Sequence, residues 1–212
     1  MIATLPMFPL ELVAFPGEEL PLHIFEQRYQ QLLEDCEDDK ITFGIPTYIN
    51  KRLEYGTEMK VLKVVKRYPS GASDVICKGV RVFKLVDFYN KLGEKLYAGG
   101  TVQFFEGIDD GTTALRAEFI RLLTAFYDEL DIVTPVVDVK TITTYTLAHK
   151  MGLSLDQEYA LLQIVSEKER YEFLIQHLSS ILPTIRTVNR TKEIIKMNGH
   201  FKNFDPLDFE EY

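Results

Sequence analysis

Tryptophan is absent from this sequence of 212 residues, and only two cysteines are present, Cys36 and Cys77. Two cysteines in a chain of this length do not make a disulfide framework, so we expect both thiols to be reduced and mostly buried. No run of residues approaches the roughly 18 apolar residues that a membrane-spanning helix needs. The opening residues, Met1 to Pro6, have neither a charged nor an apolar region of a secretory signal. These shortages predict a cytoplasmic protein with no membrane segment.

Positive charge is also scarce, because the sequence has 24 Lys and Arg compared with 32 Asp and Glu, and its formal net charge is -8. Lys and Arg supply most of the affinity for nucleic-acid phosphates, so this balance predicts that nucleic acid is not a partner. One segment is locally basic, with Lys60, Lys63, Lys66 and Arg67 close together. We interpret it as a solvated strand edge, where lysines deter pairing with other strands. Strict alternation would place Lys60 and Lys66 on one face and Lys63 on the other.

Motifs of catalysis are missing as well. The sequence has no Gly-Lys-Ser/Thr phosphate loop, no Gly-x-Ser-x-Gly elbow, no His-Glu-x-x-His and no Cys-x-x-Cys. None of the four histidines stands at metal-ligand spacing to another histidine or cysteine. Cys36 could act as a nucleophile beside a histidine, but its helical spacing with Leu32 and Leu33 favours a place in the core. The sequence thus predicts no catalytic residue, no metal site and no cofactor.

The first half of the chain alternates between apolar and polar residues, which is typical of β-strands. Within it, 25–35 carries apolar residues at helical spacing and predicts one amphipathic helix that lies on a sheet. Gly79 predicts a bulge or a close backbone approach, and Gly99-Gly100 a bend. Strands are expected over 4–10, 20–24, 41–49, 56–68, 74–88 and 97–105.

The second half has apolar residues at helical period. Capping boxes at Ser154–Gln157 and Ser166–Glu169 should each open a helix, and Pro183 should kink or end the last one, whose continuation should stop at Asn198-Gly199. Helices are further expected over 115–130, which Pro135 closes, and over 141–150, which Gly152 caps.

Strands followed by helices predict an α+β protein, not a doubly wound parallel sheet. We divide the chain into a β-rich subdomain over 1–108, a helical subdomain over 109–200 and an acidic, aromatic tail over 201–212. The tail has no periodicity, and the sequence leaves open whether it is disordered or docked through its aromatic residues.

The most specific pattern is at the start of the chain. Leu5-Pro6-Met7-Phe8-Pro9-Leu10, Phe15-Pro16-Gly17, Leu20-Pro21-Leu22-His23-Ile24-Phe25-Glu26 and Arg28-Tyr29 follow one another. Together they resemble the opening signature of the Lon protease N-terminal domain, also called the Lon substrate-binding domain. Further matches follow at Phe43-Gly44-Ile45, Tyr55-Gly56-Thr57 and Lys78-Gly79-Val80-Arg81-Val82-Phe83. A weaker match in the helical half, over Leu161 to Leu178, resembles the family's segment in which an apolar stretch leads into an Arg-rich helix, so the resemblance covers nearly the whole chain.

This resemblance implies a PUA-like β pseudo-barrel with one helix, followed by a C-terminal helical bundle. It also implies protein or peptide binding, with unfolded polypeptide or a partner protein, for example an ATP-dependent protease, as the bound species. We expect a stand-alone form without the ATPase and peptidase modules, because no peptidase dyad maps onto this sequence. One departure is Glu158-Tyr159, which stands where the family often has a Lys-Gln pair.

Six residues of the signature are candidates for binding a peptide or partner: Phe8, Phe15, His23, Phe25, Arg28 and Tyr29. The aromatic ones could line a groove for unfolded polypeptide, or they could fasten the first helix to the barrel, which is the interpretation we favour. Three functions stay open. They are a recognition module that serves as an adaptor or regulator of proteolysis, a small enzyme with an unrecognised site, and an RNA-binding PUA-like protein.

Overall fold

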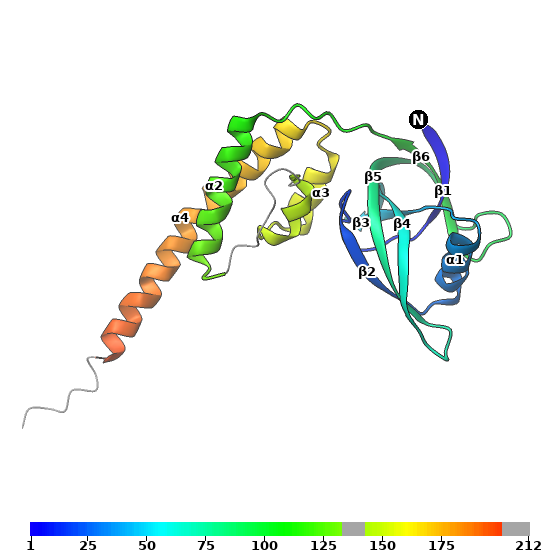
Figure 1. Cartoon of the computed structure of the whole chain (residues 1–212), viewed down its shortest axis with the longest axis horizontal. Helices are drawn as coiled ribbons and strands as arrows, with labels where there is room; N and C mark the ends of the chain where they lie inside the picture. Colours follow the sequence, from blue (N-terminus) through cyan, green and yellow to red (C-terminus); the bar gives the residue numbers. More distant parts are fainter. Residues whose placement is uncertain (133–142, 201–212) are drawn as a thin grey trace, which may run out of the picture.

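The computed structural model describes residues 1–132 and 143–200. Figure 1 shows the strands and the first helix in one part of the molecule and the later helices in another, so the α+β class with a C-terminal helical part is confirmed. The strands are β1 (Ile2–Met7), β2 (Glu19–Ile24), β3 (Phe43–Ile49), β4 (Arg52–Arg67), β5 (Ser73–Tyr89) and β6 (Ala98–Phe104). The helices are α1 (Gln27–Asp38), α2 (Thr113–Glu129), the 3-10 helix η1 (Tyr145–Lys150), α3 (Leu155–Gln163) and α4 (Glu167–His200).

The described strands form one sheet in the order β2-β5-β4-β3-β1-β6. Because β5 also pairs with β6, the sheet curls and closes on itself. Strand β5 pairs with β2 and β4 over its first part and with β6 over its last part. Its length of 17 residues allows it to pair with all three strands. β1 lies between β3, to which it is parallel, and β6, to which it is antiparallel.

Two β-bulges in β4 correct our expectation for the lysines. The pairing of β4 with β5 skips Leu62 and Val65. Each extra residue reverses the alternation of faces, so Lys60, Lys63 and Lys66 all lie on the same, outer face of the sheet. Their partners on β5 are Lys78, Ile76 and Asp74. β3 pairs only with the first part of β4, so the predicted open strand edge is confirmed.

The helix α1 covers the inner face of the sheet. The ring of Tyr29 stacks on Phe8 with centroids 3.8 Å apart, and Cys36 packs in the same core as Cys77 of β5. Both cysteines are free and buried, as predicted, and burial raises the pKa of each thiol to about 12. The buried residues of α1 are Tyr29, Leu32, Leu33 and Cys36.

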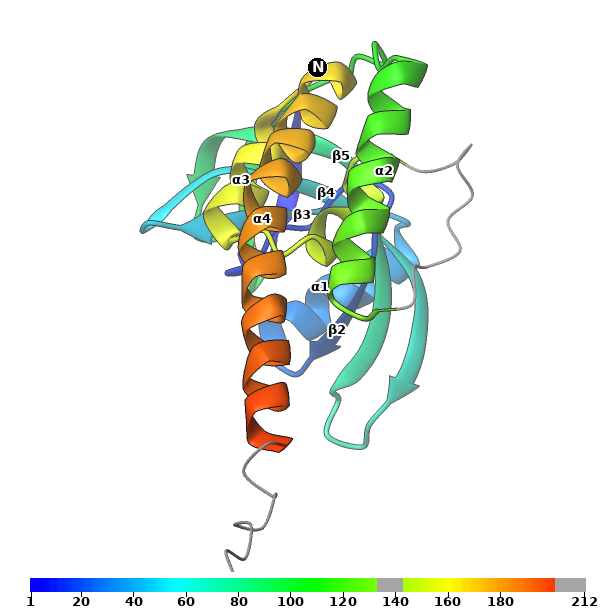
Figure 2. The same ribbon diagram turned by 90° about the vertical axis from the view of Figure 1, so that its left-hand side faces the viewer.

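The helices α2 and α4 lie side by side and run in the same direction (Figures 1 and 2). Near their first turns Arg116 Nε donates to Tyr171 OH at 3.2 Å, and at the end of α2 Arg186 Nε lies 2.8 Å from Glu129 Oε1. Between these contacts an apolar stripe is buried, including Phe119, Leu122 and Phe126 from α2 and Leu174, Leu178 and Leu182 from α4.

The expectation of a helix over 141–150 is corrected to the short 3-10 helix η1, with 141–142 and Pro135 outside the described residues. The local cause is threonine chemistry, because Thr143 Oγ1 and Thr146 Oγ1 lie 2.8 Å apart and also contact each other's backbone N–H. Such side chains compete with the backbone bonds of an α-helix. Gly152, with φ of 68°, ends this segment as predicted.

Pro183 does not end α4, which continues to His200. The proline removes one backbone donor, but it lies on the exposed side of the helix, where water can satisfy the freed carbonyl. Leu178 and Leu182 meanwhile stay buried against α2 and hold the helix in place. None of the described helices is long and apolar enough to cross a membrane.

Both predicted helix starts are present, although they differ in chemistry. Ser154 and Gln157 form a reciprocal capping box at α3. At α4, Ser166 Oγ accepts from Glu169 N at 3.1 Å. The Ser166 hydroxyl in turn donates to the carboxylate of Asp110 at 2.8 Å, and this carboxylate also accepts from Lys168 N at 2.9 Å. These bonds lower the pKa of Asp110 and tie the connection after β6 to the start of α4.

Candidate functional site

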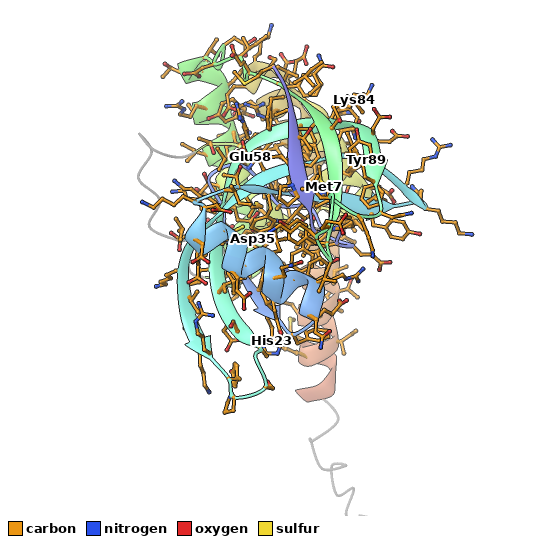
Figure 3. The ribbon with its side chains drawn as sticks, turned by 90° about the vertical axis from the view of Figure 1, so that its right-hand side faces the viewer. Met7, His23, Asp35, Glu58, Lys84 and Tyr89 are labelled. Carbon is orange, nitrogen blue, oxygen red and sulfur yellow. The ribbon has the colours of Figure 1, made fainter. Side chains whose placement is uncertain are left out.

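The six residues of the sequence signature do not form one site. Phe8 and Tyr29 lie in the core between α1 and the sheet, and Arg28 lies at the rim of that core. Phe15 is fully buried where the sheet meets the helical part. His23 and Phe25 lie on the surface near the turn between β4 and β5, where Figure 3 labels His23.

The first group holds α1 on the sheet. Burial raises the pKa of Tyr29, whose ring also carries the Arg28 guanidinium 4.7 Å from its centroid. Arg28 pairs in turn with Glu26 at 2.7 Å, as a local contact. Arg28 and Tyr29 also border a surface hollow of about 420 Å³, which they share with Tyr48 and Phe88. For Phe8 and Tyr29 the geometry agrees with the interpretation that they fasten the first helix.

The second group, on the surface, is an aromatic cluster around one carboxylate. His23 Nδ1 lies 2.6 Å from Asp74 Oδ1, and Tyr68 OH donates to Asp74 Oδ2 at 2.7 Å. These two bonds lower the pKa of Asp74. The ring of Phe25 stacks on His23 at 5.9 Å and is 64% exposed. We had included Phe25 in the helix, but it precedes α1, because Glu26 is the extended N-cap residue.

Phe15 belongs to the interface between the sheet and the helical part. Its ring lies 5.2 Å from Tyr145 and 5.0 Å from His149. His149 is held between two carboxylates, with Nε2 3.2 Å from Glu18 and Nδ1 2.7 Å from Glu158. The bond to Glu18 is the main reason that the pKa of His149 is raised to about 9, despite its partial burial. The imidazolium of η1 therefore links Glu18, just before β2, to Glu158 of α3 at neutral pH.

The Glu158-Tyr159 departure from the family pattern also falls in this interface. Glu158 is the carboxylate that contacts His149. Tyr159 OH accepts from Tyr55 N of β4 at 3.1 Å, and the two tyrosine rings meet edge to face. In this chain Glu158 therefore ties α3 to η1, and Tyr159 ties α3 to the sheet.

An apolar crevice with a volume of about 150 Å³ opens in this interface. The volume is below the ~300–1,000 Å³ typical of small-molecule sites, so the crevice suits a single inserted side chain. Apolar groups outweigh polar ones along its walls. Its main lining residues are Pro16, Tyr55, Val80, Val82, Phe105 and Leu162.

A β-bulge places Val80 at this crevice. The pairing of β5 with β4 passes from Arg81 to Gly79 and skips Val80. Bulges of this kind redirect a side chain, and Val80 is left 42% exposed. Gly79 itself lies so close to the Phe15 carbonyl oxygen that an added Cβ would stand 2.1 Å away. Both predictions for Gly79, a bulge and a close backbone approach, are confirmed.

The polar floor of the crevice is saturated with hydrogen bonds. Arg170 donates through Nη1 to the carbonyl oxygens of Ile164 and Val165 at 2.7 and 3.0 Å. Its Nε donates to Thr144 Oγ1 at 3.0 Å, and the guanidinium forms a buried ion pair with Glu167. The charge of Arg170 is thus neutralised by Glu167 within the protein. A side chain inserted into the crevice would meet mainly apolar groups.

Sequence reasoning did not identify the crevice, because its six main lining residues come from five separate segments that only the fold brings together. The bulge at Gly79 was the one available signal. Across residues 1–132 and 143–200, no group of three or more His, Cys, Asp or Glu is arranged to hold a metal ion.

The model of the ATP-dependent protease La (LON) substrate-binding domain matches residues 4–180, and the chain belongs to this family. Among solved structures, a Lon N-terminal domain protein from Xanthomonas campestris has a TM-score of 0.61 at 24% identity, covering 82% of this chain and 98% of that one. The N-terminal domain of a Mycobacterium avium complex Lon protease has a TM-score of 0.65 at 20% identity, covering 84% and 98%. Both show the same fold. A comparison with curated proteins found no matching relative.

Proposed function

We propose that this protein is a non-catalytic recognition module that binds unfolded polypeptide, with one apolar side chain of the client inserted into the crevice between sheet and helices. The observation that carries the proposal is the crevice itself, with Val80 turned to its mouth by a bulge. Membership of a substrate-binding domain family supports the same class of ligand.

The same proposal includes the cellular role. A recognition module without catalytic groups of its own can present clients to an ATP-dependent protease as an adaptor, or regulate such a protease by competing for clients. Two buried, free thiols suit the reducing cytoplasm, where we place the protein.

The test is a binding titration of a fluorescently labelled, permanently unfolded polypeptide against wild type and Val80→Asp. A carboxylate at the crevice mouth should be costly to desolvate against an inserted apolar side chain, so we expect binding to weaken roughly tenfold or more. Val80 is partly exposed, so the variant should still fold, whereas replacing the fully buried Phe15 would test stability.

Val86→Asp is the matched control, since Val86 is on the same strand, is 53% exposed and does not line the crevice. It should bind as the wild type does. Equal binding by Val80→Asp and wild type would show that the crevice is not the site. If wild type binds no unfolded polypeptide at all, the recognition role is wrong.

A further inference from the structure

The outer face of β2, β5 and the open part of β4 carries four lysines close together. The two bulges of β4 align three of them, and Lys78 of β5 lies directly opposite the first. On the far side of β5, the outward positions of β2 are Glu19, Pro21 and His23. We call Lys60, Lys63, Lys66 and Lys78, with the surface between them, the lysine face.

These lysines have little internal compensation. Among the described residues, no carboxylate lies within ion-pair distance of any of the four. The nearest candidates by register are Glu19, opposite Lys78, and Asp74, opposite Lys66. Asp74 is hydrogen-bonded to His23 and Tyr68, and it compensates only part of the charge of Lys66. In a chain of net charge -8, this face therefore keeps an excess of positive charge.

Apolar groups border the same face. The bulge residues Leu62 and Val65 are exposed at the strand edge, Val65 by 59%. At the hairpin end, Lys66 Nζ lies 4.4 Å from the centre of the Tyr68 ring, and His23 packs against both Tyr68 and the exposed Phe25. The surface thus alternates cations with apolar side chains over the length of the strand.

We infer that the lysine face binds acidic stretches of a client polypeptide that also carry apolar side chains, an inference that rests on the proposed function and narrows its substrate class. Charge complementarity selects such an occupant. A second copy of the chain would bring lysines against lysines, and the same lysines and bulges deter direct strand pairing. Nucleic acid is disfavoured by the net charge of -8.

The experiment measures fluorescence anisotropy of the full chain with a labelled synthetic peptide of about ten residues, the length of a long strand. The peptide alternates Asp or Glu with Leu or Phe, and its neutral counterpart carries Asn or Gln at the acidic positions. The protein variants are Lys63→Glu/Lys66→Glu and, as a control with the same change in net charge, Lys192→Glu/Lys196→Glu on the exposed end of α4.

We expect the acidic peptide to bind wild type more tightly than its neutral counterpart, with a preference that shrinks as salt is added. Lys63→Glu/Lys66→Glu should weaken acidic binding by roughly five- to tenfold, since two favourable charge contacts become repulsive. The control variant should change it less than twofold. Because these lysines are exposed, circular dichroism should show all variants folded.

The two proposals fail in distinguishable ways. Equal affinity for acidic and neutral peptides, or no effect of Lys63→Glu/Lys66→Glu, would overturn the lysine face while leaving client binding in the crevice intact. A single-stranded oligouridine that binds more tightly than the acidic peptide, and is lost in the same variant, would also overturn it. If neither peptide binds wild type, both proposals are wrong.

Discussion

The sheet forms one interface with α1 and another with the helical part of the chain, and the two interfaces differ in the kinds of side chain they contain. The helix α1 packs on the inner face through apolar and aromatic side chains, with its ion pairs, such as Lys95 with Asp35, at the rim. The interface between the sheet and the helical part also buries an aromatic residue, Phe15, but adds the charged His149 and the ion pair of Arg170 with Glu167.

The difference shows which residues of the family signature are taken up by packing of the core. The close-packed interface between α1 and the sheet leaves no room for a ligand in its interior. The signature residues Phe8 and Tyr29 are buried in this interface. The polar interface holds its parts together by directed contacts and retains a crevice of about 150 Å³. The family match therefore identifies the class of domain, whereas the signature residues Phe8, Phe15 and Tyr29 belong to the core.

The largest expected effect is on the free energy of unfolding, from a substitution in the interface between α1 and the sheet. Phe8→Ala removes the ring that stacks on Tyr29 and leaves a cavity, so we expect a loss of about 3–5 kcal/mol in the free energy of unfolding. Urea denaturation followed by circular dichroism measures it. Phe25→Ala, in the same signature but exposed, is the matched control and should change stability by less than about 0.5 kcal/mol. Similar losses in both variants would contradict the division made above.

A somewhat smaller effect is expected for Arg170→Met in the polar interface. The substitution leaves the Glu167 carboxylate buried without its cation, which costs on the order of 3 kcal/mol. The double variant Arg170→Met/Glu167→Gln should recover part of the loss, because no buried charge remains. Thermal denaturation of the two variants supplies the comparison, and a double variant less stable than the single one would show that the charge was not the cause.

The smallest effect concerns pH and His149. An unfolded histidine has a pKa near 6.5, and the folded value is about 9. Between these values only the folded state holds the proton, so the contribution is complete below pH 6.5 and is lost as pH rises through 9. The Tm difference between wild type and His149→Gln should therefore be largest below pH 6.5 and should approach zero at about pH 9 to 10. The side chain is 37% exposed, so solvent screening keeps the effect modest.

Local patterns predicted the elements well, because each depends on a few neighbouring residues. The six strands, α1 and the starts of α3 and α4 follow from alternation, helical spacing and caps. Two expectations about the later helices needed correction, one because of tertiary packing and one because of local side-chain hydrogen bonds. Pro183 stays inside α4 because the helix is packed on α2 and the proline faces solvent. The threonines before Leu147 bond one another and produce a 3-10 helix in place of an α-helix.

The candidate surfaces were harder to predict for a geometric reason. Strict alternation assigned Lys63 to the wrong face, because the sequence gives no warning of the bulges at Leu62 and Val65. The crevice brings together Tyr55, Val80 and Leu162, which no spacing rule connects. The predicted boundaries at 108 and 200 and the PUA-like relationship stay predictions, and the tail over 201–212 lies outside the described residues.

The position of β1 has a consequence for how the protein is made. Ile2 pairs with Gln103, so β1, once it has left the ribosome, waits for roughly 100 further residues, about 5–20 s of synthesis, before β6 exists. Until then the sheet cannot close, and the edge of β1 that later pairs with β6 stays open to wrong pairing. Such non-local pairing also slows folding of the complete chain. The nascent protein is thus itself, for several seconds, the kind of unfinished polypeptide with exposed apolar strands that chaperones and proteases inspect.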